Sequence, residues 1–300
     1  MQNDEFSTFH PAVNFFYFAV VLIFAMLFMH PLYLLLALIC LSSYDFHLSN
    51  GQFKGKLYFF LPLIFFTVLI NLLFNHQGAT ILAYFPSGNP LTLESIVYAF
   101  AASCVLANLL ISFSCFIKVI DEEKIIYLFG RFSPALALVL SLSLRFIAKF
   151  QTELKSISQS RQMFGISLKQ GSLFQRLRSA LSIFSIMLSW ALENSLDTAD
   201  SMRSRGYAAG KRSSFALYKW ERRDYFLLAW LMVLSLYLTA GVYFKVFAWH
   251  YFPTISALKI NLYAISVFAA FLLLALTPFI CQGIYRFKKP SYQSQAKERG

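Results

Sequence analysis

The sequence has little charge. Of its 300 residues only 13% are Asp, Glu, Lys or Arg, whereas 58% are hydrophobic and the mean hydropathy is +0.59. A typical soluble domain carries about 25% charged residues. This composition excludes an ordinary soluble domain and predicts a polytopic membrane protein. Acidic residues are the scarcer kind, with 14 against 26 basic residues and a net charge of +12. In a membrane chain such a surplus is typical of cytoplasmic loops, so it does not indicate a nucleic-acid partner.

The sequence also lacks the short motifs that carry chemistry. It contains no GxxxxGK[ST] loop, so we expect no ATP bound to this chain, and no HExxH or GxSxG, so nothing indicates a membrane enzyme. Neither the cysteines nor the histidines show metal-ligand spacing. The cysteines are Cys40, Cys104, Cys115 and Cys281, and the histidines are His10, His30, His47, His76 and His250. The first eleven residues contain no Lys or Arg, so no cleaved signal peptide is expected. We therefore predict no catalytic residue, metal site or cofactor in this chain.

Long hydrophobic runs are abundant. A spanning helix needs about 20 mostly apolar residues, and we assign six apolar runs to such helices, the second of them the shortest: 12–30, 32–46, 57–74, 96–117, 225–244 and 260–285. The segment 75–95 is rich in Gly, Pro and Asn and is expected to be a loop, with Thr92 as N-cap of the next helix. The tail after Tyr285 is basic and polar, and disorder is expected there. The predicted fold class is all-α, polytopic, with about six transmembrane helices and two long cytoplasmic helices.

The region 118–224 differs from the rest because it concentrates Lys and Arg. The positive-inside rule places it in the cytoplasm, and four spans before it and two after it put both termini there as well. The apolar stretch 134–150 could be a seventh span by composition. Arg145 and Lys149 shorten its apolar run to about ten residues, however, so a buried or interfacial helix is favoured. If it did span, the basic region would face outside. The expected division is 1–118, 119–223, 224–289 and a basic tail, 290–300.

Two long helices are predicted within this basic region, one from Ser133 to Phe164 and one from Ser172 to Ser204. Apolar residues recur at helical spacing in the second helix, and each helix is followed by a glycine, Gly165 or Gly206. Two interpretations of the basic end of the second helix stay open. Arg203 and Arg205 are either favourable charges near a helix C-terminus, or guanidinium groups exposed for an acidic groove on a partner.

The stretch "ADSMRSRGY" at the end of the second helix resembles the second signature of the transmembrane T component of energy-coupling factor (ECF) transporters, the EcfT/CbiQ family. That family carries two Ala-Arg-Gly motifs, each at the tip of a long cytoplasmic coupling helix. Here the second motif is Ser204-Arg205-Gly206, with Ser in place of Ala. The first would be Met163-Phe164-Gly165, where Phe164 replaces the arginine and Arg161 is nearby but out of register. The segments "FHPAVNFFYF", "FNHQGATIL" and "NPLTLES" are also similar to the family.

The resemblance implies a subunit that is not itself an enzyme, in a plasma-membrane importer of vitamins or metal ions. Its partners would be two ABC ATPases, which bind the ATP and Mg, a substrate-binding membrane S component, and lipid, with no nucleic acid. The ATPase-docking residues implied are Arg205, Ser204, Gly206, Arg203, Met163, Phe164, Gly165 and Arg161. The apolar face that would meet the S component includes Leu181, Phe184 and Leu188.

Two other classes of function predict different sequence features. A self-contained secondary transporter or channel would carry ionisable groups or paired broken helices inside its spans, and the six runs offer mainly Asn71, Asn108 and Asn261. A membrane scaffold with no ATPase partner would have no need of a basic helix tip beside Gly206.

Overall fold

The computed structural model describes residues 5–49, 53–84, 90–164, 172–207, 210, 218–244, 249–253 and 262–297. The chain forms two compact units. Unit 1 combines Met1–Ile125 with Tyr218–Gly300, and unit 2 is Ile126–Leu217. The chain therefore leaves unit 1 once and returns to it once.

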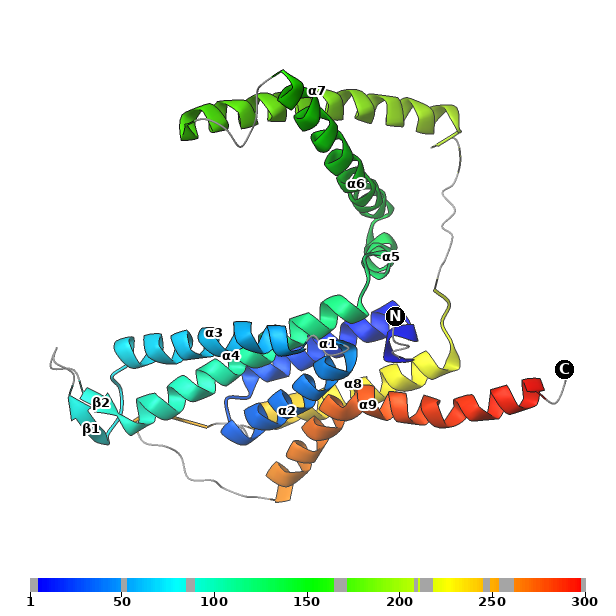
Figure 1. Cartoon of the computed structure of the whole chain (residues 1–300). Coiled ribbons are helices and arrows are strands. Elements are labelled where there is room, and N and C mark those ends of the chain that lie inside the picture. Colours follow the sequence, from blue (N-terminus) through cyan, green and yellow to red (C-terminus); the bar gives the residue numbers. More distant parts are fainter. Residues whose placement is uncertain are drawn as a thin grey trace. The chain divides into compact units, whose positions relative to one another are not determined.

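Unit 1 is a helical bundle (Figure 1). Its elements are a 3-10 helix η1 (Glu5–Thr8), α1 (Pro11–Leu27), α2 (Pro31–Ser49), α3 (Phe53–Phe74), strands β1 (Ile81–Tyr84) and β2 (Pro90–Thr92), α4 (Leu93–Val119), α8 (Arg222–Tyr243) and α9 (Leu262–Lys297). Helix α4 packs against α1, α2 and α3, while α9 packs against α2 and α8. Helix α5 (Glu122–Phe132) begins in unit 1 and ends in unit 2.

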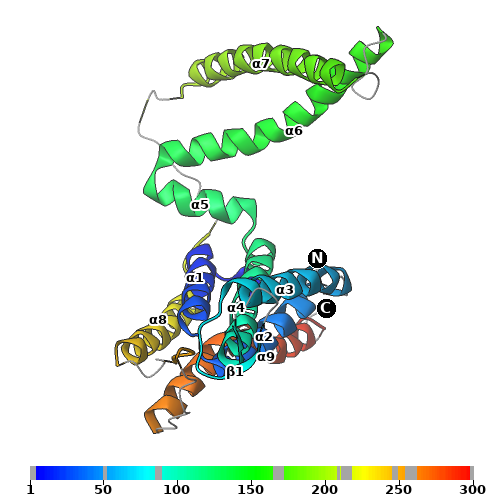
Figure 2. The same cartoon turned by 90° about the vertical axis from the view of Figure 1, so that its left-hand side faces the viewer.

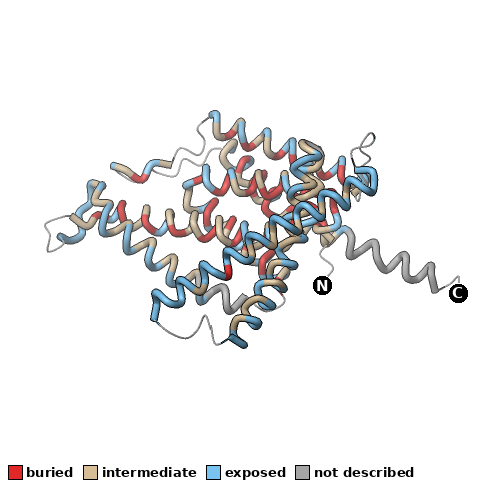
Figure 3. Tube along the Cα trace, turned by 90° about the horizontal axis from the view of Figure 1, so that it is seen from above, coloured by how far each residue is buried: buried red, intermediate tan, exposed pale blue. Residues whose placement is uncertain are grey.

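Aromatic side chains make up much of the core of unit 1. The ring of Phe6, which is fully buried, lies 5.1 Å from that of Tyr17 and 6.3 Å from that of Tyr44. On α9, the ring of Phe271 lies 5.5 Å from that of Phe28. Figure 3 shows buried positions gathered on the helices of this bundle. Many large apolar residues on the outside of the bundle are exposed, as on α3, which is expected where lipid covers the surface.

Helix length and composition agree with an integral membrane protein. Among the described residues, five helices are long and apolar enough to cross a bilayer: α2, α4, α8, the first part of α9, and α6 (Pro134–Met163). Helix α1 and the apolar part of α3, Phe60–Phe74, are shorter. The prediction of an all-α, polytopic membrane protein is confirmed. The candidacy of α6 departs from our interpretation of 134–150, because an 18-residue stretch of this helix is apolar enough to span even with Arg145 and Lys149 present. None of its described residues is buried, so within this chain it is not a buried helix.

Two further predictions are corrected, and one helix was not predicted. The segment 75–95 contains an antiparallel pair, β1 with β2, because Ile81–Tyr84 is rich in β-favouring residues and the backbone N–H of Thr80 reaches the Glu94 carboxylate at 3.3 Å. The charged stretch after α4 forms helix α5, which is strongly amphipathic. The tail is helical as far as Lys297, because extending an existing helix adds a backbone hydrogen bond for each residue.

Candidate functional site

Unit 2 is built around two long helices, α6 and α7 (Leu173–Ser204), whose beginnings follow from local sequence. Ser133 caps α6 by accepting the Leu136 N–H at 3.5 Å, and Pro134 occupies the first turn. Ser172 and Gln175 form a capping box on α7, with hydrogen bonds of 3.4 and 3.0 Å between each side chain and the other's backbone N–H. The two predicted coupling helices thus form with nearly the expected bounds.

The two helices pack in an antiparallel way. The Phe150 ring meets the Trp190 ring at 5.4 Å, edge to face. Towards one side of this contact Lys149 donates to Asn194 at 3.4 Å, and towards the other Arg161 donates to the Ser182 hydroxyl at 2.5 Å. Residues later in α6 thus contact residues earlier in α7, as expected for antiparallel helices. Figure 2 shows the pair converging near the end of α6 and spreading at the other end.

One face of α7 is apolar and exposed. It carries eight large side chains, each at least 51% exposed, which we call the α7 stripe: Leu173, Phe174, Leu177, Leu181, Phe184, Leu188, Leu192 and Leu196. At 100° per residue these positions fall within about 140° of one another. Trp190, which contacts α6, lies on the opposite side of α7, as does Ile183, its only buried residue among those described. The predicted contact residues Leu181, Phe184 and Leu188 therefore belong to a longer surface that α6 does not cover.

Arg205 lies at the C-cap of α7 and is exposed. The helix ends in a Schellman motif, in which the Tyr207 N–H donates to the Met202 carbonyl and the Gly206 N–H donates to the Arg203 carbonyl, both at 3.0 Å. Gly206 has φ of +81°, a conformation that glycine adopts without strain. The glycine of the motif thus terminates the helix where Arg205 is presented to solvent, with Ser204 and Arg203 exposed beside it.

The end of α6 has a different character. Met163 and Phe164 are 87% and 83% exposed, and Phe164 is the C-cap. Arg161 is half-buried, and its guanidinium is engaged with Ser182 on α7. Gly165 lies outside the described residues. This tip is therefore apolar, and the arginine nearest to it holds the two helices together.

The two tips are far apart. Because α6 and α7 are antiparallel and Arg161 contacts Ser182, the end of α6 lies beside the first third of α7, whereas Arg205 follows its last residue. A helix of 32 residues is about 48 Å long. The structure thus places Ser204, Arg205, Gly206 and Arg203 at the end of α7 and Met163 and Phe164 beside its first third, and the α7 stripe runs along the helix from Leu173 to Leu196.

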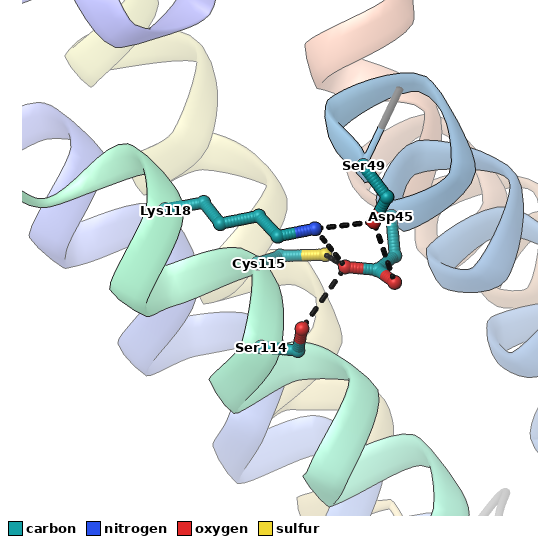
Figure 4. Close-up of polar contacts among 5 residues, drawn as sticks. All are labelled: Asp45, Ser49, Ser114, Cys115 and Lys118. Carbon is teal, nitrogen blue, oxygen red and sulfur yellow. Dashed lines mark hydrogen bonds and ion pairs between the residues drawn. The ribbon is translucent and has the colours of Figure 1, made fainter. Parts of the chain in front are cut away.

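In unit 1, a buried ion pair secures the end of α4. Asp45 on α2 is fully buried, and its carboxylate lies 3.0 Å from the Lys118 ammonium on α4 (Figure 4). The same carboxylate accepts hydrogen bonds from the hydroxyls of Ser114 at 3.0 Å and Ser49 at 3.3 Å. No local sequence pattern predicts this pair, because the two residues are 73 positions apart. A charge among apolar helices was the available signal.

The family model of CbiQ, described as cobalt transport protein, matches residues 7–215. The energy-coupling factor transporter transmembrane protein EcfT of Exiguobacterium sibiricum is 28% identical over 187 residues, covering 59% of this chain and 70% of the relative. EcfT 1 of Listeria monocytogenes is 28% identical over 193 residues, covering 60% and 70%. EcfT of Listeria innocua is 35% identical over 101 residues, covering 33% and 38%.

The family match includes most of the bundle of unit 1, both long helices of unit 2 and the Ser204-Arg205-Gly206 motif. A match of this extent joins the membrane part and the exposed helix pair in one family. This chain therefore belongs to the CbiQ family, the transmembrane T components of energy-coupling factor transporters.

Proposed function

We propose that this chain is the energy-coupling subunit of an ECF-type ABC importer in the plasma membrane, with both termini in the cytoplasm. Two ABC ATPases would bind the two tips of the α6–α7 pair, and an S component would bind the α7 stripe. ATP and Mg would be held by the ATPases, with no cofactor in this chain. The cargo class would be a micronutrient, either a vitamin or a metal ion.

The observation that carries this proposal is the layout of unit 2. One helix presents an exposed guanidinium at its end and an uncovered apolar face along its length. Contiguous exposed apolar surface of this kind marks a site of protein or membrane contact. From Ser182, which Arg161 contacts near the end of α6, to Arg205 the helix runs about 35 Å, which leaves room for two separate partners at the two tips.

The mechanism follows from the packing of the two helices. A helix is stiff along its axis, so a displacement of the Arg205 end of α7 is carried to the stripe. The contacts of α6 with α7 are few and cluster around Phe150 and Trp190, with Arg161 and Ser182 further along. When two ATPases close on ATP, they would move the two tips relative to each other and change the crossing of the helices. The α7 stripe would then shift under the S component and release its cargo.

The test is co-expression of the tagged chain with candidate ABC ATPase pairs, followed by purification in detergent. We expect the wild type to retain two ATPases and Arg205→Glu to lose at least one, because a carboxylate would then face an acidic groove. Lys155→Glu is the matched control, since it reverses an exposed charge near the middle of the helix pair, and it should retain both. Equal retention by Arg205→Glu would remove the docking role of the tip. If the wild type purified without any ATPase, the alternative function of a self-contained transporter or channel would be favoured.

A further inference from the structure

The chain crosses between the two units at two places, and both crossings have their base in unit 1. We call residues 119–125 the exit junction and residues 218–225 the re-entry junction. They are far apart in sequence, since the whole of unit 2 lies between them. Any force that unit 2 transmits through the backbone to unit 1 must pass through these two junctions.

The exit junction is held by a buried lysine. Lys124 is 5% exposed, and its ammonium donates to the carbonyl of Ser7 at 2.7 Å and to the carbonyl of Val119 at 2.6 Å. Burying an ammonium is costly unless its hydrogen bonds are made. Lys124 thus ties the first turn of α5 to the backbone of η1, near the N-terminus of the chain.

The re-entry junction is held by the residues that follow η1. Asp224 is 2% exposed, and its carboxylate accepts the His10 backbone N–H at 3.2 Å and the Glu221 backbone N–H at 2.9 Å. The His10 ring stacks on the Trp220 ring at 3.9 Å, and the Arg223 guanidinium lies over the Phe9 ring at 5.2 Å. Three residues of this junction therefore contact two consecutive residues near the N-terminus.

The segment that makes both sets of contacts, Glu5–His10, is itself anchored. We call it the strap. Phe6 and Phe9 are 0% and 2% exposed, and Phe6 packs in the aromatic core against Tyr17 and Tyr44. Two buried aromatic side chains make this short segment a fixed part of the bundle.

A further observation indicates that the two junctions are close to each other. Burial raises the pKa of the Tyr218 hydroxyl, and the carboxylates of Glu123 and Asp121 raise it further. Tyr218 belongs to the re-entry junction, whereas Glu123 and Asp121 belong to the exit junction. All of these residues lie outside the membrane-spanning segments.

We propose that the strap is a positioning element that locks the exit and re-entry junctions to each other. Lys124 and Asp224 are its two attachment residues, and they act on one another through the strap. The proposal rests on the proposed function in one respect, namely that unit 2 transmits motion. A shared base would prevent the two junctions from yielding separately, so that displacement at the helix tips reaches the α7 stripe instead of being lost at the base.

The test is hydrogen–deuterium exchange of the purified full chain in detergent, read by mass spectrometry. In Lys124→Met the exit attachment is lost, and we expect exchange of residues 219–226 to rise at least about fivefold, although Lys124 lies 100 positions away from Asp224. In the reciprocal variant, Asp224→Ala, exchange of residues 119–126 should rise. Unchanged exchange at the distant junction in both variants would overturn the proposal.

Two controls make the result specific. Lys149→Met removes a lysine hydrogen bond in unit 2, to Asn194, and should leave residues 219–226 unchanged. Residues 90–100 in Lys124→Met should also exchange as in the wild type. A rise there equal to that at the re-entry junction would mean general loosening of the bundle, and would contradict a specific link through the strap.

The strap and the proposed function can fail separately. Exchange is measured on the chain alone and needs no ATPase. In the co-purification experiment, Lys124→Met should retain both ATPases, because the docking tips lie in unit 2. Loss of an ATPase from Lys124→Met would assign this lysine to docking and overturn its role in the strap. Failure of every ATPase to bind wild type would remove the proposed function while leaving the exchange result intact.

Discussion

At the residue scale, Gly206 explains why the Arg205 side chain is exposed at the end of α7. The positive φ of Gly206 allows the chain to turn away immediately after α7, so Arg205 is the last residue of the helix end. A Cβ at this position would meet no atom within 4 Å. The requirement for glycine is therefore one of backbone conformation and not of space.

This predicts that Gly206→Ala alters docking more than folding. A left-handed conformation costs a non-glycine residue about 1–2 kcal/mol, so the helix end would rearrange and move the guanidinium. We expect weaker retention of the ATPase at this tip, measured by co-purification, with little change in the thermal stability of the chain. Gly210→Ala is the matched control, because Gly210 also has open space around it and shows no positive φ. A loss of ATPase in Gly210→Ala as large as in Gly206→Ala would contradict this explanation.

The Asp45–Lys118 pair supports a second prediction at this scale. Asp45 is fully buried, whereas the Lys118 side chain is 28% exposed. Removing the lysine leaves a carboxylate that cannot reach water, but removing the aspartate leaves a long cationic side chain that can turn towards the interface. Breaking a buried pair typically costs about 3–5 kcal/mol.

We therefore expect Lys118→Met to lower the thermal unfolding temperature in detergent more than Asp45→Leu does. The double variant should be more stable than Lys118→Met, because no uncompensated charge remains. The measurement is an unfolding curve followed by size-exclusion fluorescence. Equal losses in both single variants would show that the exposed fraction of Lys118 does not relieve its charge.

At the scale of elements, α7 divides its surface into two faces. Trp190 and Ser182 hold one face to α6, and the α7 stripe occupies the other. A helix that leaves eight large apolar side chains exposed gains little from folding alone. Contact of the α7 stripe with another apolar surface would remove these side chains from water and stabilise the helix.

A charge within the stripe should therefore block a partner without unfolding the chain. We expect Leu188→Asp to weaken binding of the S component by at least about tenfold, because the carboxylate would be buried without a partner. Ile186→Asp is the control, since Ile186 is 44% exposed but lies outside the stripe. Both variants should retain the ATPases in co-purification. Retention of the S component by Leu188→Asp at the wild-type level would exclude this part of the stripe from the contact.

At the scale of the whole molecule, the membrane topology depends on α6. Its length and composition would allow it to cross the bilayer, yet our interpretation of the basic region places it in the cytoplasm. The two topologies put the end of α6 on opposite sides of the membrane. They leave the β1–β2 pair, which precedes α6, on the outer side in both cases.

Cysteine labelling separates these topologies. In a variant with Cys40, Cys104, Cys115 and Cys281 replaced, we introduce Phe164→Cys or Tyr84→Cys, at positions that are 83% and 68% exposed. We expect an impermeant maleimide to label Tyr84→Cys in intact cells and Phe164→Cys only in opened membranes. Labelling of both in intact cells would establish α6 as a spanning helix.

The sequence predicted those features whose causes are local. Ser133 with Pro134, and Ser172 with Gln175, specify where α6 and α7 begin, and Gly206 specifies where α7 ends, since capping involves residues within one turn. The motif around Arg205 was found for the same reason. The β1–β2 pair was missed because its strands are only four and three residues long and lie in a segment whose Gly, Pro and Asn favour a loop. Helix α5 was missed because its amphipathic pattern is short and charged.

By itself the sequence determined that this is a helical membrane protein of the T-component family with two long helices in a basic region, because composition, periodicity and capping are written in consecutive residues. Only the tertiary structure decided which face of α7 is left uncovered by α6, that Arg161 hydrogen-bonds Ser182, and that Asp45 pairs with Lys118. It also decided that the strap meets both junctions. These are contacts between residues that are up to 214 positions apart, and their energies depend on packing that no local pattern encodes.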